Sequence, residues 1–226
     1  MSPTLADLSP LWLSVRVASL AAILDVSAGV PLAYLLARAR FPGKGLLAGL
    51  LLLPLVLPPT VLGYYLLLIF GRRGGFGWWL EHTLGVVVVF HWTGAVLASA
   101  VAAFPLFLIP ARGAIEGVDP ALEDVARLLG RRELSVFTSV TFPLAWRGMA
   151  AGAVLSFVRA MGDFGATMMV GGNIPGRTQT AALAIYNAVE SDAPERAAWL
   201  SLAVSIVSVS ALWIAQKSLP SQGAAR

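Results

Sequence analysis

The sequence contains no cysteine and few charged residues. None of its 226 residues is cysteine, which excludes disulfide bonds, thiolate metal sites and cysteine nucleophiles. Only 12% of the residues are charged, whereas 58% are hydrophobic. An average soluble domain has about a quarter of its residues charged. This balance excludes an ordinary soluble domain and indicates a protein embedded in a membrane.

Sequence motifs typical of enzymes are absent as well. The chain has no G-x-x-x-x-G-K-[ST] phosphate loop, no His-Glu-x-x-His motif, no Gly-x-Ser motif and no repeated His/Asp/Glu spacing. We therefore expect no catalytic residue, no metal and no cofactor bound by this chain. Of the two histidines, His82 is expected on the surface of a loop, and His91 is expected within the third span as a packing or interface residue. The net charge of +4 is scattered over short loops, which argues against nucleic acid as a partner.

Long apolar runs occupy more than half of the chain. A helix needs roughly 20 apolar residues to cross a bilayer, and five windows reach that length: Leu11–Ala37, Leu46–Phe70, Leu84–Ile109, Met149–Val170 and Ala197–Gln216. The sequence predicts an all-α membrane protein with about five transmembrane helices, forming one domain over residues 1–226 with its core at about 11–216. The apolar stretch Gln179–Val189 would rise only about 16 Å as a helix. It is predicted to be a short re-entrant or interfacial helix on the outer side.

Lysine and arginine are unevenly divided between the loops on the two sides. One set of loops holds ten of them: Arg38, Arg40, Lys44, Arg112, Arg127, Arg131, Arg132, Arg147, Lys217 and Arg226. The opposite set holds four: Arg72, Arg73, Arg177 and Arg196. Because positively charged loops are retained in the cytoplasm, the N-terminus is predicted outside and the C-terminus in the cytoplasm. Arg16, near the outer end of the first span, is expected to reach the interface.

A polar segment separates the third and fourth predicted spans. Asp119 and Pro120 are typical of a helix N-cap followed by proline at the first helical position. Three apolar side chains then recur at helical spacing, and Gly130 suits a left-handed turn at a helix end. A second amphipathic stretch leads to Pro143. From the residues alone, the segment 119–143 is either a connector on the membrane surface or a docking element for a cytoplasmic partner.

This segment resembles the cytoplasmic signature of permease subunits of ATP-binding-cassette (ABC) importers, E-A-A-x3-G-x9-I-x-L-P. With every spacing kept, the signature falls on Asp124, Val125, Ala126, Gly130, Val140, Phe142 and Pro143, of which Ala126, Gly130 and Pro143 are identical. In that family the segment is the coupling helix, which sits in a groove of the ATPase subunit. The resemblance implies the type I importer permease fold and these docking residues: Glu123, Asp124, Val125, Ala126, Leu129 and Gly130.

A second stretch, "RAMGDFGATMMVGGNIPGRTQT", resembles the molybdate permeases of the same family, which run close to R-A-x-G-E-F-G-A-T-x-M-V-x-G-N-I-P-G-R-T-Q-T. The notable departure is Asp163, where glutamate is usual. Sulfate permeases tend toward a lysine and an acidic residue after N-I-P, where this chain has Gly176–Gln179. The resemblance implies molybdate as the transported anion, with tungstate not separable from it and a sulfate permease as the alternative.

The resemblance also implies partners. These are a second copy of the chain, two ATPase subunits that bind ATP and magnesium, an extracytoplasmic oxyanion-binding protein, and membrane lipid. An alternative of another class is a secondary anion transporter driven by ions, which would show inverted repeats and several intramembrane carboxylates. The chain shows no convincing repeat, and only Asp25 and Asp163 lie within spans.

Charged residues near the middle of the predicted spans need partners, because an unpaired charge there costs about 2.5–3.5 kcal/mol. Arg159 and Asp163 lie at i and i+4 in the fourth span, and Asp25 lies in the first. We expect Arg159 to pair with Asp163, with Asp25 as a second candidate acceptor. The pair is either structural or part of the translocation path. Arg177 and Thr178, in the predicted outer turn, are candidates for contact with the substrate or its binding protein.

Overall fold

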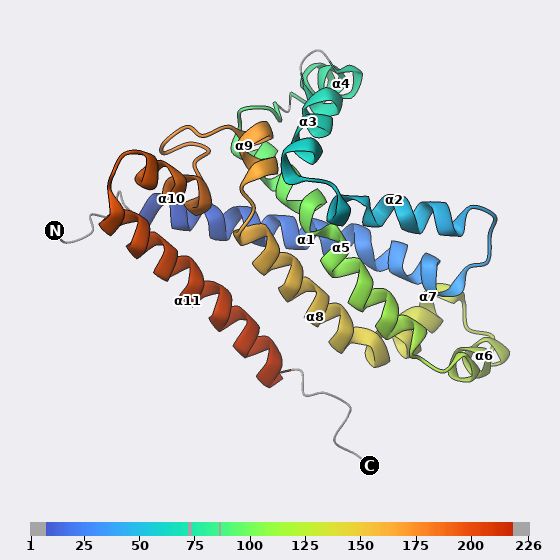
Figure 1. The fold of residues 1–226 in the computed structure, drawn as a ribbon. Helices are drawn as coiled ribbons and strands as arrows, with labels where there is room; N and C mark the ends of the chain where they lie inside the picture. The colour runs from blue at the N-terminus through green and yellow to red at the C-terminus, as the bar shows by residue number, and fades with distance from the viewer. Residues whose placement is uncertain (1–7, 72–73, 86, 219–226) are drawn as a thin grey trace.

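The computed structural model of the protein describes residues 8–71, 74–85 and 87–218. Predictions on Arg72, Arg73 and Arg226 concern residues outside these ranges. Within the ranges every regular element is helical: α1 (Ser9–Arg38), α2 (Lys44–Val56), α3 (Pro59–Phe70), α4 (Gly75–Leu84), α5 (Trp92–Glu116), α6 (Pro120–Leu128), α7 (Glu133–Val136), the π-helical turn η2 (Phe137–Thr141), α8 (Phe142–Met161), α9 (Gly165–Gly171), α10 (Ala181–Glu190) and α11 (Pro194–Ser218). The predicted all-α class is confirmed (Figure 1).

Three helices are each long and apolar enough to cross a membrane, namely α1, α5 and α11. Two further spans are bent pairs: α2 with α3, which meet at 118°, and the helix ending at Met161 with α9, which meet at 67°. The count therefore reaches the predicted five if each bent pair is one span. The first bend lies at residues 57–58 and the second at residues 162–164.

The break between α2 and α3 follows from two consecutive prolines. Leu57 adopts extended backbone angles, φ −70° and ψ 140°, and Pro58 is also outside the helical region at ψ 137°. A residue that precedes proline is disfavoured in the helical region because its backbone clashes with the proline ring. Leu57 therefore ends α2, and Pro59 supplies the first position of α3, where a missing N–H costs nothing.

The third span begins later than predicted. Gly85, in the left-handed region at φ 64°, ends α4, and α5 starts only at Trp92. His91 is extended and caps α5, because its side chain accepts a hydrogen bond from the backbone N–H of Thr93. The expectation that His91 lies within the span is therefore wrong, because it precedes α5. The short helix α10 confirms the helix predicted within Gln179–Val189, shifted by one or two residues.

The core of the bundle lies between α1, α5 and α8. Phe107 of α5 is fully buried, with Ala33 and Leu36 of α1 and Met149 of α8 in the same cluster. Small residues allow the helices to approach closely: a Cβ at Gly152 would lie 2.8 Å from the backbone oxygen of Phe107. These three helices thus form the rigid frame on which the polar segment is mounted.

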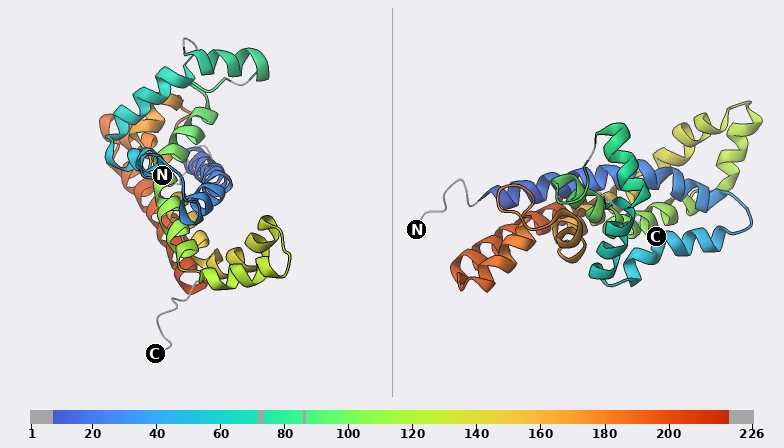
Figure 2. Two further views of the ribbon diagram at one scale, coloured as in Figure 1. Left: turned by 90° about the vertical axis from the view of Figure 1, so that its right-hand side faces the viewer. Right: turned by 90° about the horizontal axis from the view of Figure 1, so that it is seen from above.

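The two ends of the frame carry different elements. At one end, α6 and α7 lie beside the C-terminal end of α1 (Figure 1). The N-terminal end of α1 and the short helix α10 lie at the opposite end, and the right-hand view of Figure 2 shows the same separation along the long axis. The segment resembling the coupling helix and the turn that contains Arg177 are therefore far apart.

Candidate functional site

Helix α6 has both of the predicted caps. The side chain of Asp119 accepts a hydrogen bond from the backbone N–H of Ala121 at 2.9 Å, and Pro120 is the first helical residue. At the other end Gly130 has φ 78°. The N–H of Arg131 bonds to the carbonyl of Ala126, and the N–H of Gly130 bonds to that of Arg127. This is a Schellman ending, which closes α6 after nine residues and turns the chain toward α7.

The apolar stripe of α6 faces away from the rest of the chain. Leu128 and Leu129 are 87% and 77% exposed, and Val125 and Leu122 are about half exposed. Leu134 at the start of α7 is also exposed. We call this surface the apolar face of α6, and define it as Leu122, Val125, Leu128, Leu129 and Leu134. Exposed apolar side chains gathered on one face mark contact with a partner protein or with the membrane surface, because water solvates them poorly.

Glu123 lies on the opposite side of α6 and is 1% exposed. Its Oε1 accepts hydrogen bonds from Arg38 Nε and Nη2 at 3.1 and 2.9 Å, and from Thr141 Oγ1 at 2.8 Å. Its Oε2 lies 3.5 Å from Arg127 Nη2. We call these four residues the Glu123 anchor. They join α6 to the end of α1 and to η2, and Arg38 also donates to the carbonyl of Val118 at 2.8 Å.

The burial of Glu123 corrects one part of the predicted docking set. Glu123 and Ala126 were expected at the docking surface, but both are buried against the protein's own helices. Asp124, Val125, Leu129 and Gly130 do face outward. Helical periodicity explains the difference, because residues three apart share a face and Glu123 and Ala126 therefore point inward together.

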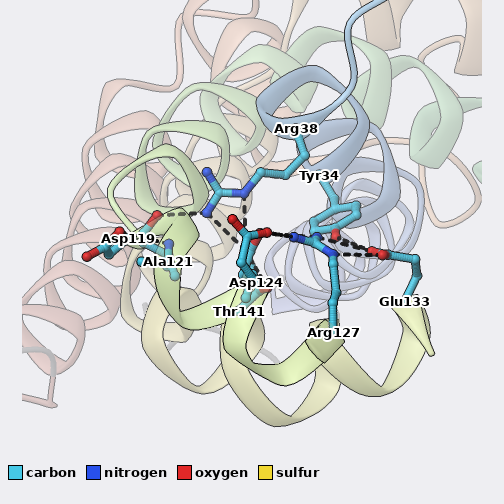
Figure 3. A network of polar contacts seen from close by, with 10 residues as sticks. Tyr34, Arg38, Asp119, Ala121, Asp124, Arg127, Glu133 and Thr141 are labelled. Atoms are coloured by element: carbon cyan, nitrogen blue, oxygen red, sulfur yellow. Dashed lines mark hydrogen bonds and ion pairs between the residues drawn. The ribbon is translucent and has the colours of Figure 1, made fainter. Parts of the chain in front are cut away.

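A second, more exposed layer of charges surrounds the anchor. Arg127 donates to Glu133 Oε1 and to Asp124 Oδ1, both at 2.8 Å, and Tyr34 of α1 donates to Glu133 at 3.4 Å. Figure 3 shows Arg38 and Tyr34 reaching this network from α1 and Arg127 reaching it from α6. The hydrogen bonds between Glu133 and Arg127 lower the pKa of Glu133 below its ordinary value. The same bonds raise the pKa of Arg127 above its ordinary value. The network therefore holds both groups charged at neutral pH.

The π-helical turn η2 places the hydroxyl that completes the anchor. Phe137–Thr141 forms one wide turn between α7 and α8, and Thr141 at its end is fully buried. A single π turn inserted in a helix is frequent at functional sites. Here it links the anchor directly to the start of α8, so that a displacement of α6 acts on a spanning helix.

The predicted intramembrane ion pair forms. Arg159 Nη1 lies 3.2 Å from Asp163 Oδ1, and the Arg159 side chain is 32% exposed whereas Asp163 is 1% exposed. Asp163 lies in the break between α8 and α9, where its Oδ2 accepts from the backbone N–H of Thr167 at 2.9 Å. The expectation that both residues share a helical face is therefore wrong, since Asp163 follows the end of α8 and its carboxylate bonds to the first turn of α9.

Asp25 does not join this pair. It is buried in α1 and accepts a hydrogen bond from Ser156 Oγ of α8. Among the ion pairs between described residues, Arg159 has one partner, Asp163. Asp25 therefore links α1 to α8, and the expectation of a second acceptor for Arg159 is wrong.

Thr178 and Arg177 differ in their surroundings. Thr178 is 2% exposed, and its Oγ1 accepts from the backbone N–H of Ile174 at 3.0 Å, so it holds the turn together. Asn173 also lies in the turn and bonds to Gln179 at 3.0 Å and to Asn187 of α10 at 2.8 Å. Arg177 is exposed and lines a cavity beside the N-terminal end of α1.

Residues 29–220 match the family described as "Binding-protein-dependent transport system inner membrane component". The chain belongs to this family. The Molybdenum transport system permease protein ModB of Escherichia coli (strain K12) is 45% identical over 201 residues, which cover 87% of this chain and 88% of ModB. The ModB of Haemophilus influenzae is 42% identical, covering 93% of this chain and 92% of that protein.

A solved structure shares the fold of this family member. The crystal structure of an amino acid ABC transporter with histidines has a TM-score of 0.62 and 16% sequence identity, and the match covers 93% of this chain and 91% of that one. Together with the family match, this confirms an ABC importer permease fold in a multi-pass inner-membrane component. The chain is a non-catalytic translocation subunit that works with an ATPase and a binding protein. The alternative of an ion-coupled secondary transporter is therefore excluded.

Sequence reasoning missed the partners that hold the site together. Arg38 lies 85 residues before Glu123, and Ser156 lies 131 residues after Asp25. No spacing rule connects residues at such separations. The available signal was weak: Glu123 is an acidic residue at an inward position of an amphipathic helix, and a buried carboxylate requires a donor.

Proposed function

We propose that this protein is the membrane-spanning subunit of an ATP-driven molybdate importer. The supporting observation is that relatives carrying the name molybdenum transport permease match it over most of their length at 42–45% identity. The turn 172–180 adds support, because Asn173, Thr178 and Gln179 of the molybdate-type signature form the hydrogen bonds within it and from it to α10. Replacement of Gly176–Gln179 by the lysine and acidic residue typical of sulfate permeases would remove part of this bonding.

In this proposal the apolar face of α6 docks into a groove of the ATPase subunit, which binds ATP and magnesium. The face is exposed, lies next to the outward carboxylate of Asp124, and is presented on a capped helix. Burying a leucine contributes about 1.5–3 kcal/mol, so the exposed leucines of this face would contribute to the affinity of the contact. Glu123 then acts by positioning α6 on α1 and η2 instead of contacting the ATPase.

Two copies of the chain and two ATPase subunits would make the complete transporter, with the N-terminus outside and the C-terminus in the cytoplasm. ATP binding would draw the two ATPase subunits together, and each α6 would follow the groove that holds it. Because the Glu123 anchor joins α6 to α1 and through Thr141 to α8, that movement would be transmitted to two spanning helices. The path would thereby alternate between outward and inward access.

Arg159 is the best placed intramembrane group for contact with the anion. Its guanidinium is one third exposed although Asp163 beside it is buried, so it retains N–H donors for another partner. Asp163 would fix its direction, Asp25 would hold α1 to α8, and Arg177 with Thr178 would form part of the outer entrance. A binding protein would deliver the oxyanion there.

Uptake by the reconstituted complex tests the proposal. The permease, its ATPase and the binding protein are placed in proteoliposomes, and ATP-dependent uptake of radioactive molybdate is measured with tungstate or sulfate as competitor. We expect uptake that requires ATP and resists excess sulfate. An ATPase variant without its phosphate-loop lysine is the control and should abolish uptake. Uptake that sulfate suppresses as strongly as unlabelled molybdate, or that persists with the inactive ATPase, would contradict the proposal.

A further inference from the structure

A cavity of about 380 Å³ lies at the end of the molecule opposite α6. Three separate segments form it: the N-terminal end of α1, the residues that lead into α5, and the turn 172–180. Ligand pockets in proteins begin at roughly 300 Å³. The cavity is therefore large enough for a small ligand, and it belongs neither to the Glu123 anchor nor to the Arg159–Asp163 pair.

The described lining of this cavity is cationic. Arg16 and Arg177 both line it, no aspartate or glutamate is among its described lining residues, and neither arginine forms an ion pair with a described residue. The Arg16 guanidinium lies 4.1 Å from the centre of the Trp92 ring, a cation–π contact that leaves its N–H groups available. Two like charges that share a cavity repel each other, and a bound anion would remove that repulsion.

His91 also lines the cavity, and its Nδ1 bonds within the protein, to the hydroxyl of Thr93 at 2.9 Å. The two guanidinium groups are therefore the charged donors of the lining. Such a lining suits a ligand that offers several acceptor oxygens, because planar guanidinium groups bind such oxygens in pairs.

We propose that this cavity is an oxyanion-binding subsite of the permease itself, which accepts a tetrahedral dianion after its release from the binding protein. The inference rests on the proposed function and adds a named place of entry to it. Four oxygens occupy roughly the volume of four water molecules, about 120 Å³, so the anion keeps part of its hydration in the cavity. Binding is accordingly weak. An entry site requires weak binding, because the anion must leave it again.

Equilibrium dialysis of the intact permease–ATPase complex tests this subsite without the binding protein. The probe is radioactive molybdate, with tungstate and chloride as competitors. We expect saturable binding that tungstate displaces and an equal ionic strength of chloride does not. Arg16→Gln and Arg177→Gln should each weaken binding about tenfold, the loss expected from one charge-assisted contact. Arg177→Lys should fall between wild type and Arg177→Gln, because it keeps the charge without the paired donors.

Arg196→Gln is the matched control. Arg196 lies at the start of α11 and lines a different cavity, so its removal changes the net charge equally and should leave binding unchanged. Equal binding by wild type, Arg16→Gln and Arg177→Gln, or no saturable binding by wild type, would overturn the inference. Weaker docking of the binding protein to both variants, with unchanged molybdate binding, would overturn it too and would assign the arginines to protein contact.

Uptake separates this inference from the proposed function. If wild-type complex imports molybdate with ATP and binding protein but dialysis finds no site, the subsite alone is wrong. If wild-type complex fails to import molybdate, the proposed function fails, whatever the cavity binds.

Discussion

Replacement of Arg38 by glutamine would test whether the Glu123 anchor holds α6 in place. The substitution removes the two hydrogen bonds of 3.1 and 2.9 Å to the Glu123 carboxylate and the one of 2.8 Å to the Val118 carbonyl. Glu123 would remain buried, with Thr141 and the more distant Arg127 as its only partners from the anchor. A buried carboxylate that loses its counter-charge destabilises the state that buries it.

The expected magnitude follows from the burial of the two groups. Removing one member of a fully buried pair costs about 3–5 kcal/mol. Here Glu123 is 1% exposed but Arg38 is 17% exposed, and two contacts to the carboxylate survive, so we expect about 2 kcal/mol. That corresponds to a roughly 30-fold shift in the equilibrium between attached and detached α6.

Hydrogen exchange of the α6 amides in the permease measures this equilibrium, and molybdate transported per ATP hydrolysed by the full complex measures its consequence. Arg38→Gln should speed exchange in Pro120–Leu128 about 30-fold and reduce transport more than ATP hydrolysis. The double variant Arg38→Gln with Glu123→Gln should recover most of the protection, because replacing both partners removes the unpaired charge.

Arg112→Gln is the control for this experiment. It breaks the exposed pair with Glu116 at the end of α5, and exposed pairs contribute less than about 1 kcal/mol. The reasoning is refuted if Arg38→Gln leaves α6 exchange at the level of Arg112→Gln. The reasoning is refuted equally if the double variant loses as much protection from hydrogen exchange as Arg38→Gln and Glu123→Gln lose in sum.

Three further predictions concern other parts of the site. Leu129→Ser should weaken binding of the ATPase at least tenfold in a pull-down titration, because a leucine buried at the contact contributes about 1.5–3 kcal/mol; unchanged affinity would show that the apolar face of α6 is not the contact. Arg159→Gln should abolish uptake while the assembled complex still elutes normally by size exclusion, and loss of assembly alone would assign the Arg159–Asp163 pair a structural role. Glu133 has a lowered pKa in the folded protein, caused chiefly by its hydrogen bonds to Arg127. The contribution of Glu133 to the stability of the folded protein is therefore complete above its ordinary pKa of 4.5. It is lost as the pH falls through the lowered pKa of the folded state. The unfolding temperature of Glu133→Gln should accordingly equal that of wild type only in strong acid. Equal unfolding temperatures already at pH 6 would contradict this.

Much of the fold was predictable because a bilayer imposes simple rules on a sequence. Apolar length located the three long helices and the two bent pairs, since a segment that crosses lipid must satisfy its own backbone hydrogen bonds there. The caps of α6 were predictable for a similar reason: Asp119, Pro120 and Gly130 act through local backbone geometry. Where prolines or glycines cluster, as at Pro58 and Pro59, the sequence signalled a break but not its angle of 118°.

The candidate site was predictable only in its local parts. The Arg159–Asp163 pair spans four residues, so helical spacing brought the two groups within reach even though a break separates them from a common helix. The inward direction of Glu123 could not be predicted from the pattern of α6, because the apolar side of this helix faces outward and its polar side meets α1.

By itself, the sequence determined that this protein is helical, lies in a membrane and carries one capped polar segment between two spans. Those properties depend on composition, local backbone preferences and signatures of a few dozen residues, which are all contained within one stretch of chain. The tertiary structure alone decided that Arg38 meets Glu123 and that Arg16 and Arg177 share a cavity. Such contacts join residues from distant helices, and only the packing of α1, α5 and α8 around small residues fixes where those helices meet.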